Sequence, residues 1–112
     1  MRSYVALSLI SWHRESQQLL TVTLQAIGVE VCPYDVPGRT AVHIMPETIE
    51  RLSKIDNITC IKDATGDMGY ATDVLGRCKG RVALLSGDDF TTFPFLALGG
   101  SGSVSVASNV IP

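Results

Sequence analysis

The sequence has few cysteines, few charges and no long apolar run. Charged residues make up 18% of the 112 residues and aromatic residues 6%. Nine basic against eleven acidic residues give a net charge of −2, so the chain lacks the basic field that nucleic acids and anionic membranes attract. No apolar stretch approaches the ~20 residues that a helix needs to cross a bilayer. We therefore expect no nucleic-acid or membrane partner, and with 46% hydrophobic residues we expect one domain with a modest core.

The three cysteines are an odd number and include no Cys-x-x-Cys pair. Neither a zinc ribbon nor a disulfide framework is indicated, and reduced, buried thiols in a cytoplasmic protein are the preferred interpretation. His13 and His43 have no partner at metal-ligand spacing, and His43 is expected at the surface. The apolar stretch 4–12 faintly resembles a signal-peptide core, but it lacks a small-residue cleavage site. No metal and no cofactor is expected.

From residue 29 onward, short β-prone runs alternate with helical segments. The runs at 29–34, 57–62, 81–86 and 102–107 predict four strands, and a further helix is expected at 15–27. The order β-α-β-α-β-α-β, with the spacing of compact βα units, predicts an α/β fold with a parallel sheet, either open or closed into a barrel.

Helix boundaries are marked by capping residues and by proline. Pro46 stands in the first turn of one predicted helix, and Asp67 is expected to cap the next. Asp88 or Asp89 is expected to cap the third helix. The predicted buried faces of the second and third helices are formed by Tyr70, Val74, Leu75 and Cys78, and by Phe93, Leu96 and Ala97, respectively.

Functional sites in α/β folds gather at the carboxyl ends of strands, and here these ends bear reactive side chains. Lys62 ends one strand, and Tyr34, followed by Arg39, ends another. A lysine among apolar walls can become a neutral amine that attacks a carbonyl and forms a Schiff base. The Tyr34 hydroxyl could relay protons, and Arg39 could clamp a carboxylate.

Each of these residues also has a plain structural interpretation. A lysine after a strand usually extends to solvent, and a single tyrosine usually packs with its hydroxyl satisfied. The turns at Gly66 and Gly87 could bind phosphate at helix N-termini, but neither matches a phosphate-binding motif. The residue pattern alone leaves these alternatives open.

Four motifs in a fixed order resemble one enzyme family. Residues 34–40 read YDVPGRT, similar to the YNVPxRT motif of the dihydrodipicolinate synthases (4-hydroxy-tetrahydrodipicolinate synthases). Residues 61–67 read IKDATGD, similar to IKEATGD, and residues 84–89 match LLSGDD. Residues 102–109 are similar to GVISVTAN. The resemblance runs from about Pro33 to Pro112.

The family is a (β/α)₈ barrel that condenses pyruvate with aspartate semialdehyde in lysine biosynthesis. The resemblance implies that Lys62 is the Schiff-base lysine and that Tyr34 belongs to the proton relay. It implies that Arg39 receives the carboxylate of the aldehyde substrate. Gly87 and Val104 match positions that line the pyruvate pocket, with Val104 in place of the usual isoleucine. The sister lyases share the lysine and the tyrosine but lack the arginine, so Arg39 favours the synthase.

The departures from the family are equally informative. A full barrel takes ~250 residues, so only the last four strands are expected here. The family's Gly-Thr-Thr-Gly-Glu segment and its second relay tyrosine are absent, and Asp35 stands where asparagine is usual. We therefore expect a non-matching segment at 1–32 and a partial barrel at 33–112.

The leading hypothesis is a fragment of a dihydrodipicolinate synthase, a cytoplasmic lyase whose substrates are pyruvate and aspartate semialdehyde. The resemblance also implies a homo-oligomer for the full-length family. Two alternatives are another pyruvate aldolase of the same superfamily and a non-catalytic βα protein. Pyruvate trapping at Lys62 separates the third hypothesis from the first two, and the effect of Arg39→Ala separates the first from the second.

Overall fold

The fold is an open parallel sheet covered by helices. The computed structural model describes residues 5–7, 26 and 28–111. Its strands are β1 (Val5–Leu7), β2 (Val31–Asp35), β3 (Cys60–Asp63), β4 (Ala83–Ser86) and β5 (Gly102–Ser103). Its helices are α2 (Pro37–Thr40), α3 (Pro46–Leu52), α4 (Met68–Cys78), α5 (Thr92–Ala97) and the 3₁₀ helix η1 (Ala107–Asn109). Among the described residues, no helix has the length and apolar character needed to span a membrane.

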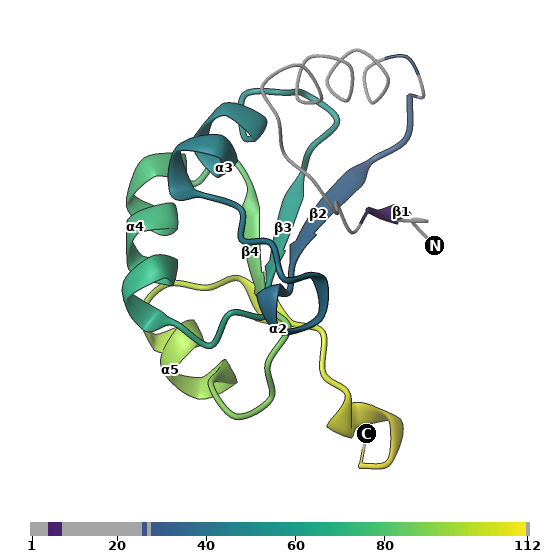
Figure 1. The fold of residues 1–112 in the computed structure, drawn as a ribbon, viewed down its shortest axis with the longest axis vertical. Coiled ribbons are helices and arrows are strands. Elements are labelled where there is room, and N and C mark those ends of the chain that lie inside the picture. The colour runs from purple at the N-terminus through teal and green to yellow at the C-terminus, as the bar shows by residue number, and fades with distance from the viewer. Residues whose placement is uncertain (1–4, 8–25, 27, 112) are drawn as a thin grey trace.

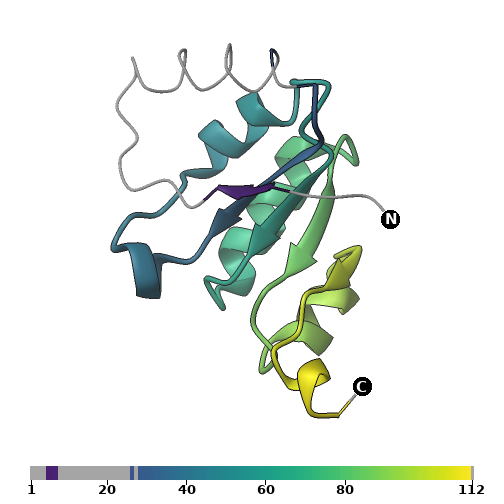
Figure 2. The ribbon, with the colours of Figure 1, turned by 90° about the vertical axis from the view of Figure 1, so that its right-hand side faces the viewer.

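All the strand pairs of the sheet are parallel, and the strands follow chain order from β1 to β5. Helices α3, α4 and α5 lie on one side of the sheet (Figure 1 and Figure 2). The predicted parallel α/β architecture is confirmed. Strand β1 adds a fifth strand to the four that were expected.

The core lies between the sheet and the helices. Side chains alternate between the two faces of a strand, so residues 31, 61 and 84 point toward the helices. These residues join side chains of α3, α4 and α5 in one apolar cluster, which includes Val31, Ile61, Leu84, Ile49, Leu52, Val74 and Phe95. The residues that alternate with them, such as Tyr34 and Lys62, consequently lie on the opposite face of the sheet, which these helices do not cover.

The predicted starts of helices α3 and α4 are confirmed. Pro46 opens α3. The carboxylate of Asp67 accepts hydrogen bonds from the backbone N–H groups of Gly69 (2.8 Å) and Tyr70 (3.1 Å), which satisfies two free donors at the start of α4. Lys79 ends α4 in the left-handed conformation at φ 50°.

The predicted cap of α5 is wrong. The helix begins at Thr92 after Thr91, so neither Asp88 nor Asp89 occupies its N-cap. The Asp89 carboxylate instead accepts hydrogen bonds from Val106 N–H (3.1 Å) and Ala107 N–H (2.9 Å). These contacts turn the chain into η1, and β5 consequently ends at Ser103 rather than at residue 107.

The predicted buried face of α5 is also wrong. Phe95 is the buried residue of this helix, with 1% of its surface exposed, whereas Phe93 is 83% exposed. Gly100 makes room for the Phe95 ring, because a Cβ atom at position 100 would overlap that ring. On α4 the prediction was better: Tyr70, Val74 and Cys78 are buried.

The remaining sequence predictions have mixed outcomes. Cys32, Cys60 and Cys78 are buried and free, as expected. The helix expected at 15–27 falls outside the described residues except for Ala26. His13 also lies outside them.

Candidate functional site

Lys62 and Tyr34 lie side by side at the carboxyl ends of two neighbouring strands. The two residues are paired in the register between β2 and β3. The Lys62 Nζ atom lies 4.0 Å from the centre of the Tyr34 ring, over its face. A cation over an aromatic face is attracted by the ring's quadrupole, so this contact orients the amine. The adjacency predicted from the strand ends is therefore present.

Gly87 and Val104 extend the same region across β4. The Gly87 N–H donates a hydrogen bond to the Asp63 carbonyl (2.6 Å), and the Val104 N–H donates to the Ser86 carbonyl (2.8 Å). A Cβ atom at Gly87 would lie 2.7 Å from the Lys62 Cε atom. The absence of a side chain at position 87 thus leaves room for the lysine stem.

Arg39 lies apart from this pair. It is an exposed residue of α2, the short helix that follows β2. Among the described residues, no hydrogen bond or ion pair joins Arg39 to Tyr34 or Lys62. The guanidinium is therefore open to solvent beyond the carboxyl end of β2.

A pair of thiols lies below Tyr34 and Lys62. Cys32 and Cys60 precede them by two residues on the same strands, and both are buried. Burial raises the pKa of the Cys32 thiol, and a hydrogen bond with Cys60 raises it further. A thiol whose pKa is raised stays protonated and is a poor nucleophile. We therefore expect no nucleophilic role for Cys32.

A polar cluster lies behind Tyr34 and Lys62, on the helix-covered face of the sheet. Asp35 is 1% exposed, and its Oδ2 atom lies 2.8 Å from the Nδ1 atom of His43. The prediction of His43 as an ordinary surface residue is thus incomplete, because its ring is anchored to a buried carboxylate. The His43 ring also packs on Tyr70, with ring centres 4.5 Å apart.

Tyr70 and Asp63 complete this cluster. The Tyr70 hydroxyl donates a hydrogen bond to the Ile44 carbonyl (2.7 Å), and burial raises the pKa of Tyr70. Burial also raises the pKa of Asp63, against a hydrogen bond from Thr65 N–H (2.8 Å) that lowers it. Sequence reasoning missed this cluster, although one signal was available: a carboxylate directly follows both Tyr34 and Lys62.

The raised pKa of Asp63 predicts a specific dependence of stability on pH. The folded chain holds the Asp63 proton more tightly than the unfolded chain does. The resulting stabilisation is fully present below the usual pKa near 3.8 and is lost as the pH rises through the raised value. The asparagine side chain of Asp63→Asn cannot ionise, so this variant does not lose stability in this way as the pH rises. We expect the free energy of unfolding of the native chain, relative to Asp63→Asn, to fall between pH 3 and neutrality in urea denaturation.

The control for this measurement is Asp56→Asn, because Asp56 is exposed. The difference between this variant and the native chain should change less with pH. Parallel stability curves for the native chain and Asp63→Asn would contradict the prediction.

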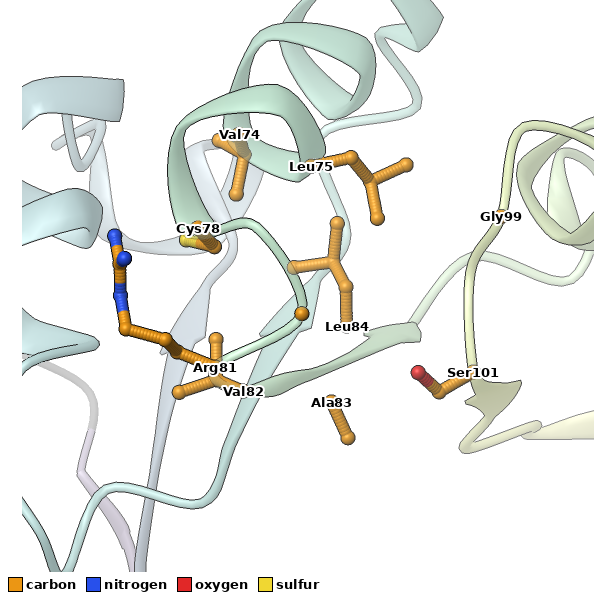
Figure 3. Close-up of a pocket in the computed structure, with 10 residues that line it drawn as sticks. Val74, Leu75, Cys78, Arg81, Val82, Ala83, Leu84, Gly99 and Ser101 are labelled. Atoms are coloured by element: carbon orange, nitrogen blue, oxygen red, sulfur yellow. The ribbon is translucent and has the colours of Figure 1, made fainter.

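A hollow of about 280 Å³ lies at the opposite ends of the strands. Figure 3 shows its walls: Val74, Leu75 and Cys78 from α4, the start of β4, and Gly99 and Ser101 from the segment that precedes β5. None of the predicted site residues lines it. Because parallel-sheet sites form at the carboxyl ends of strands, we assign the candidate site to the Lys62 region rather than to this hollow.

Comparison with known proteins settles the family. The model of the dihydrodipicolinate synthetase family matches residues 13–112. The chain belongs to this family. This match begins before Pro33, the residue at which the resemblance carried by the four motifs begins. The division of the chain into a segment 1–32 and a segment 33–112 stays a prediction.

The chain matches other members of the dihydrodipicolinate synthetase family over only part of their length. The 4-hydroxy-tetrahydrodipicolinate synthase of Syntrophobacter fumaroxidans is 51% identical over 88 residues, which cover 79% of this chain and 30% of that protein. The corresponding synthase of Geobacter sulfurreducens is 44% identical over 92 residues, or 82% and 32% of the two chains. The chain therefore spans about a third of these relatives.

Solved structures of the family show the same partial coverage. The structure of the dihydrodipicolinate synthase of Acinetobacter baumannii in complex with pyruvate has a TM-score of 0.88 and 33% sequence identity to this chain. The alignment covers 97% of this chain and 38% of the Acinetobacter chain. The enzyme of Bacillus anthracis has a TM-score of 0.85 and 37% identity, with 96% and 38% covered. The chain therefore forms part of a (β/α)₈ barrel, as the sequence predicted.

Proposed function

We propose that this chain contributes the Schiff-base lysine, Lys62, to the active site of a 4-hydroxy-tetrahydrodipicolinate synthase. In this site Lys62 captures pyruvate for condensation with aspartate semialdehyde. The observation that carries the proposal is the contact between Lys62 Nζ and the Tyr34 ring (4.0 Å) at paired strand ends. Membership of the family supports it, because a lysine and a tyrosine occupy the motif positions that the family uses.

The chemistry begins with the Lys62 amine. Its nitrogen bonds to the carbonyl carbon of pyruvate, the carbonyl oxygen leaves as water, and a protonated imine forms. This imine draws electrons from the neighbouring methyl carbon, which loses a proton and attacks the aldehyde carbon of the second substrate. The Tyr34 hydroxyl accepts and returns the protons of these steps.

Arg39, Gly87 and Val104 complete the proposal. Arg39 stands exposed beyond the end of β2, where its planar guanidinium can receive the carboxylate of the aldehyde substrate. Gly87 keeps space beside the Lys62 stem, and the backbone at Val104 forms the wall beyond β4. Gly87 and Val104 would therefore border the place of pyruvate next to the amine, and Arg39 would contact the second substrate.

Borohydride trapping tests the proposed function. The chain is incubated with pyruvate and sodium borohydride, and the product is analysed by intact mass and peptide mapping. Of the three lysines, we expect the reduced pyruvate adduct on Lys62 and not on Lys54 or Lys79. No adduct on soluble, folded protein, or equal labelling of all three lysines, would overturn the proposal.

A variant at Arg39 distinguishes the synthase from other pyruvate aldolases. Arg39→Ala should leave the pyruvate adduct on Lys62 unchanged. In the complete barrel it should weaken the use of aspartate semialdehyde, because the carboxylate of that substrate loses its partner. Unchanged use of the aldehyde by Arg39→Ala would overturn the role assigned to Arg39, whereas failure of the native protein to use it would favour another member of the superfamily.

Gly87→Ala should disturb the site without unfolding the chain. The new methyl group would lie 2.7 Å from the Lys62 Cε atom and 3.0 Å from the Ala64 Cβ atom, so the flexible lysine must move away from Tyr34. A displacement of about 1 Å can slow a reaction up to about 100-fold. We expect a large fall in the rate of adduct formation, measured by mass spectrometry over time.

Gly76→Ala is the matched control for Gly87→Ala. Gly76 lies in α4, and a Cβ atom there meets nothing within 4 Å. Alanine in place of a helical glycine should stabilise the chain by about 0.5–1 kcal/mol and leave adduct formation unchanged. Equal trapping rates in the two variants would contradict the role assigned to Gly87.

A further inference from the structure

The two carboxylates behind the candidate site are neighbours across the sheet. Asp35 directly follows Tyr34 and Asp63 directly follows Lys62, and the two aspartates are paired in the register between β2 and β3. Paired residues on parallel strands point to the same face. Asp35 and Asp63 therefore lie together on the helix-covered face, where they are 1% and 3% exposed.

Each aspartate has one oxygen without a partner. The Oδ1 atom of Asp35 and the Oδ2 atom of Asp63 are buried and make no hydrogen bond. A buried polar atom left unsatisfied costs about 1–3 kcal/mol, and two neighbouring buried carboxylates do not both ionise readily. A single proton between the two carboxyl groups would resolve both problems, because a protonated carboxyl group donates to an ionised one.

The surroundings assign that proton to Asp63. The Oδ2 atom of Asp35 lies 2.8 Å from the His43 Nδ1 atom and accepts a hydrogen bond from the Ile44 N–H (3.3 Å), so this carboxyl group is placed as the acceptor of the pair. Asp63 has polar contacts with Thr65, including a hydrogen bond that its Oδ1 atom accepts from the Thr65 N–H (2.8 Å). Burial and the neighbouring charge of Asp35 both raise the pKa of Asp63.

We propose that Asp35 and Asp63 share one proton, which Asp63 donates to Asp35, and that this pair positions Tyr34 and Lys62 for reaction. This hydrogen bond would join Asp35 and Asp63, the last residues of β2 and β3. Each aspartate directly follows the residue that it positions. Asp35 and Asp63 are positioning residues, because they lie on the opposite face from the amine. The positioning role rests on the proposed function, whereas the shared proton does not.

Loss of the shared proton should separate the two strand ends. With both carboxylates ionised and close together, repulsion would push β2 and β3 apart and loosen the contact between Lys62 and the Tyr34 ring. The titratable groups that face the pair are His43, from the connection between α2 and α3, and Tyr70, from α4. The His43 Nδ1 atom lies at the Oδ2 atom of Asp35. The Tyr70 hydroxyl also contacts Asp35, but its one proton is donated to the Ile44 carbonyl, so neither group supplies the proton between the two carboxyl groups.

Carbon-13 NMR of the side-chain carboxyl groups tests the shared proton without any substrate. The full chain is labelled uniformly, and Asp35→Asn and Asp63→Asn assign the two signals. We expect the Asp63 signal to keep the chemical shift of a protonated carboxyl group to a higher pH than the signal of exposed Asp56. In Asp35→Asn, the Asp63 signal should titrate at lower pH, because the amide donates to it and the neighbouring charge is gone.

Two results would overturn the shared proton. The first is titration of Asp63 together with Asp56. The second is a response of the Asp35 and Asp63 signals to added potassium or sodium chloride but not to choline chloride, which would show a bound monovalent cation between them. A proton-sharing pair predicts no such difference between the salts.

The positioning role is tested by the rate of borohydride-trapped adduct formation across pH. Asp63→Asn donates permanently to Asp35 and should retain most of the rate, whereas Asp63→Leu should lose about tenfold or more. The ratio of the native rate to the Asp63→Asn rate should fall as the pH rises, and pH effects common to both proteins cancel in this ratio. A constant ratio would indicate a purely structural role and overturn the positioning part.

Failure of the proposed function gives a different result from failure of this inference. Absence of any adduct in the native chain at every pH would overturn the proposed function, and with it the positioning role. The NMR titration would still decide the shared proton. Adduct formation with equal pH profiles in the native chain and Asp63→Asn would keep the proposed function and overturn the positioning role.

Discussion

Lys62→Ala should reduce the borohydride-trapped pyruvate adduct to background. The adduct requires a primary amine whose nitrogen becomes part of the imine, and alanine supplies none. Lys62→Arg should fail equally, although it keeps a positive charge over the Tyr34 ring, because a guanidinium does not form the imine. Loss in both variants would show that the nucleophile is needed rather than the charge.

The structure predicts that these variants still fold. Lys62 lies on the face away from the helices, and its cation–π contact with Tyr34 is worth about 0.5–1 kcal/mol at most for a partly exposed pair. Circular dichroism and urea denaturation should therefore be close to those of the native chain. Lys54→Arg, on the exposed side of the molecule, should keep the full adduct. Persistence of the adduct in Lys62→Ala would refute the assignment of the nucleophile.

Phe95→Ala should have the largest effect on stability. Phe95 is 1% exposed and is the buried side chain by which α5 joins the core cluster. Truncation of a buried phenylalanine costs about 3–5 kcal/mol, since it removes apolar contacts and leaves a cavity. In a chain of 112 residues this is a large part of the total stability. We expect a strongly lowered urea midpoint, or loss of cooperative unfolding.

Phe93→Ala is the matched control on the same helix. Phe93 is 83% exposed, so its removal should change the free energy of unfolding by no more than about 0.5 kcal/mol. Equal destabilisation by the two variants would show that α5 does not dock through Phe95. Improved solubility of Phe93→Ala would be consistent with its exposure.

The proximity of Tyr34 and Lys62 could be predicted from the logic of parallel sheets. Lys62 and Tyr34 are separated by 28 positions, yet both end strands, and consecutive parallel strands place their carboxyl ends together. The cap of α4 by Asp67 was equally predictable, because the contact spans three residues and depends on local geometry. Local signals and strand order were therefore sufficient for these features.

Contacts between distant residues could not be predicted from the sequence. Asp89 looked like a helix cap, but its carboxylate binds backbone groups 17 and 18 residues further along the chain. Phe95 rather than Phe93 is buried because α5 is one short helix whose rotation is set by packing against the rest of the core. Asp35 and His43 meet through an intervening turn and helix that no periodicity describes.

The strict chain order of the sheet also bears on how the protein is made. Each strand from β2 to β5 pairs with the strand that precedes it in the sequence, so every addition finds its partner already synthesised. Domains emerging from the ribosome can begin to fold from their N-terminal side at the pace of translation. This sheet can accordingly be assembled vectorially, one βα unit at a time, with the edge last formed serving as the template for the next strand. Lys62 would meet Tyr34 as soon as β3 docks, before β4 and β5 have joined the sheet.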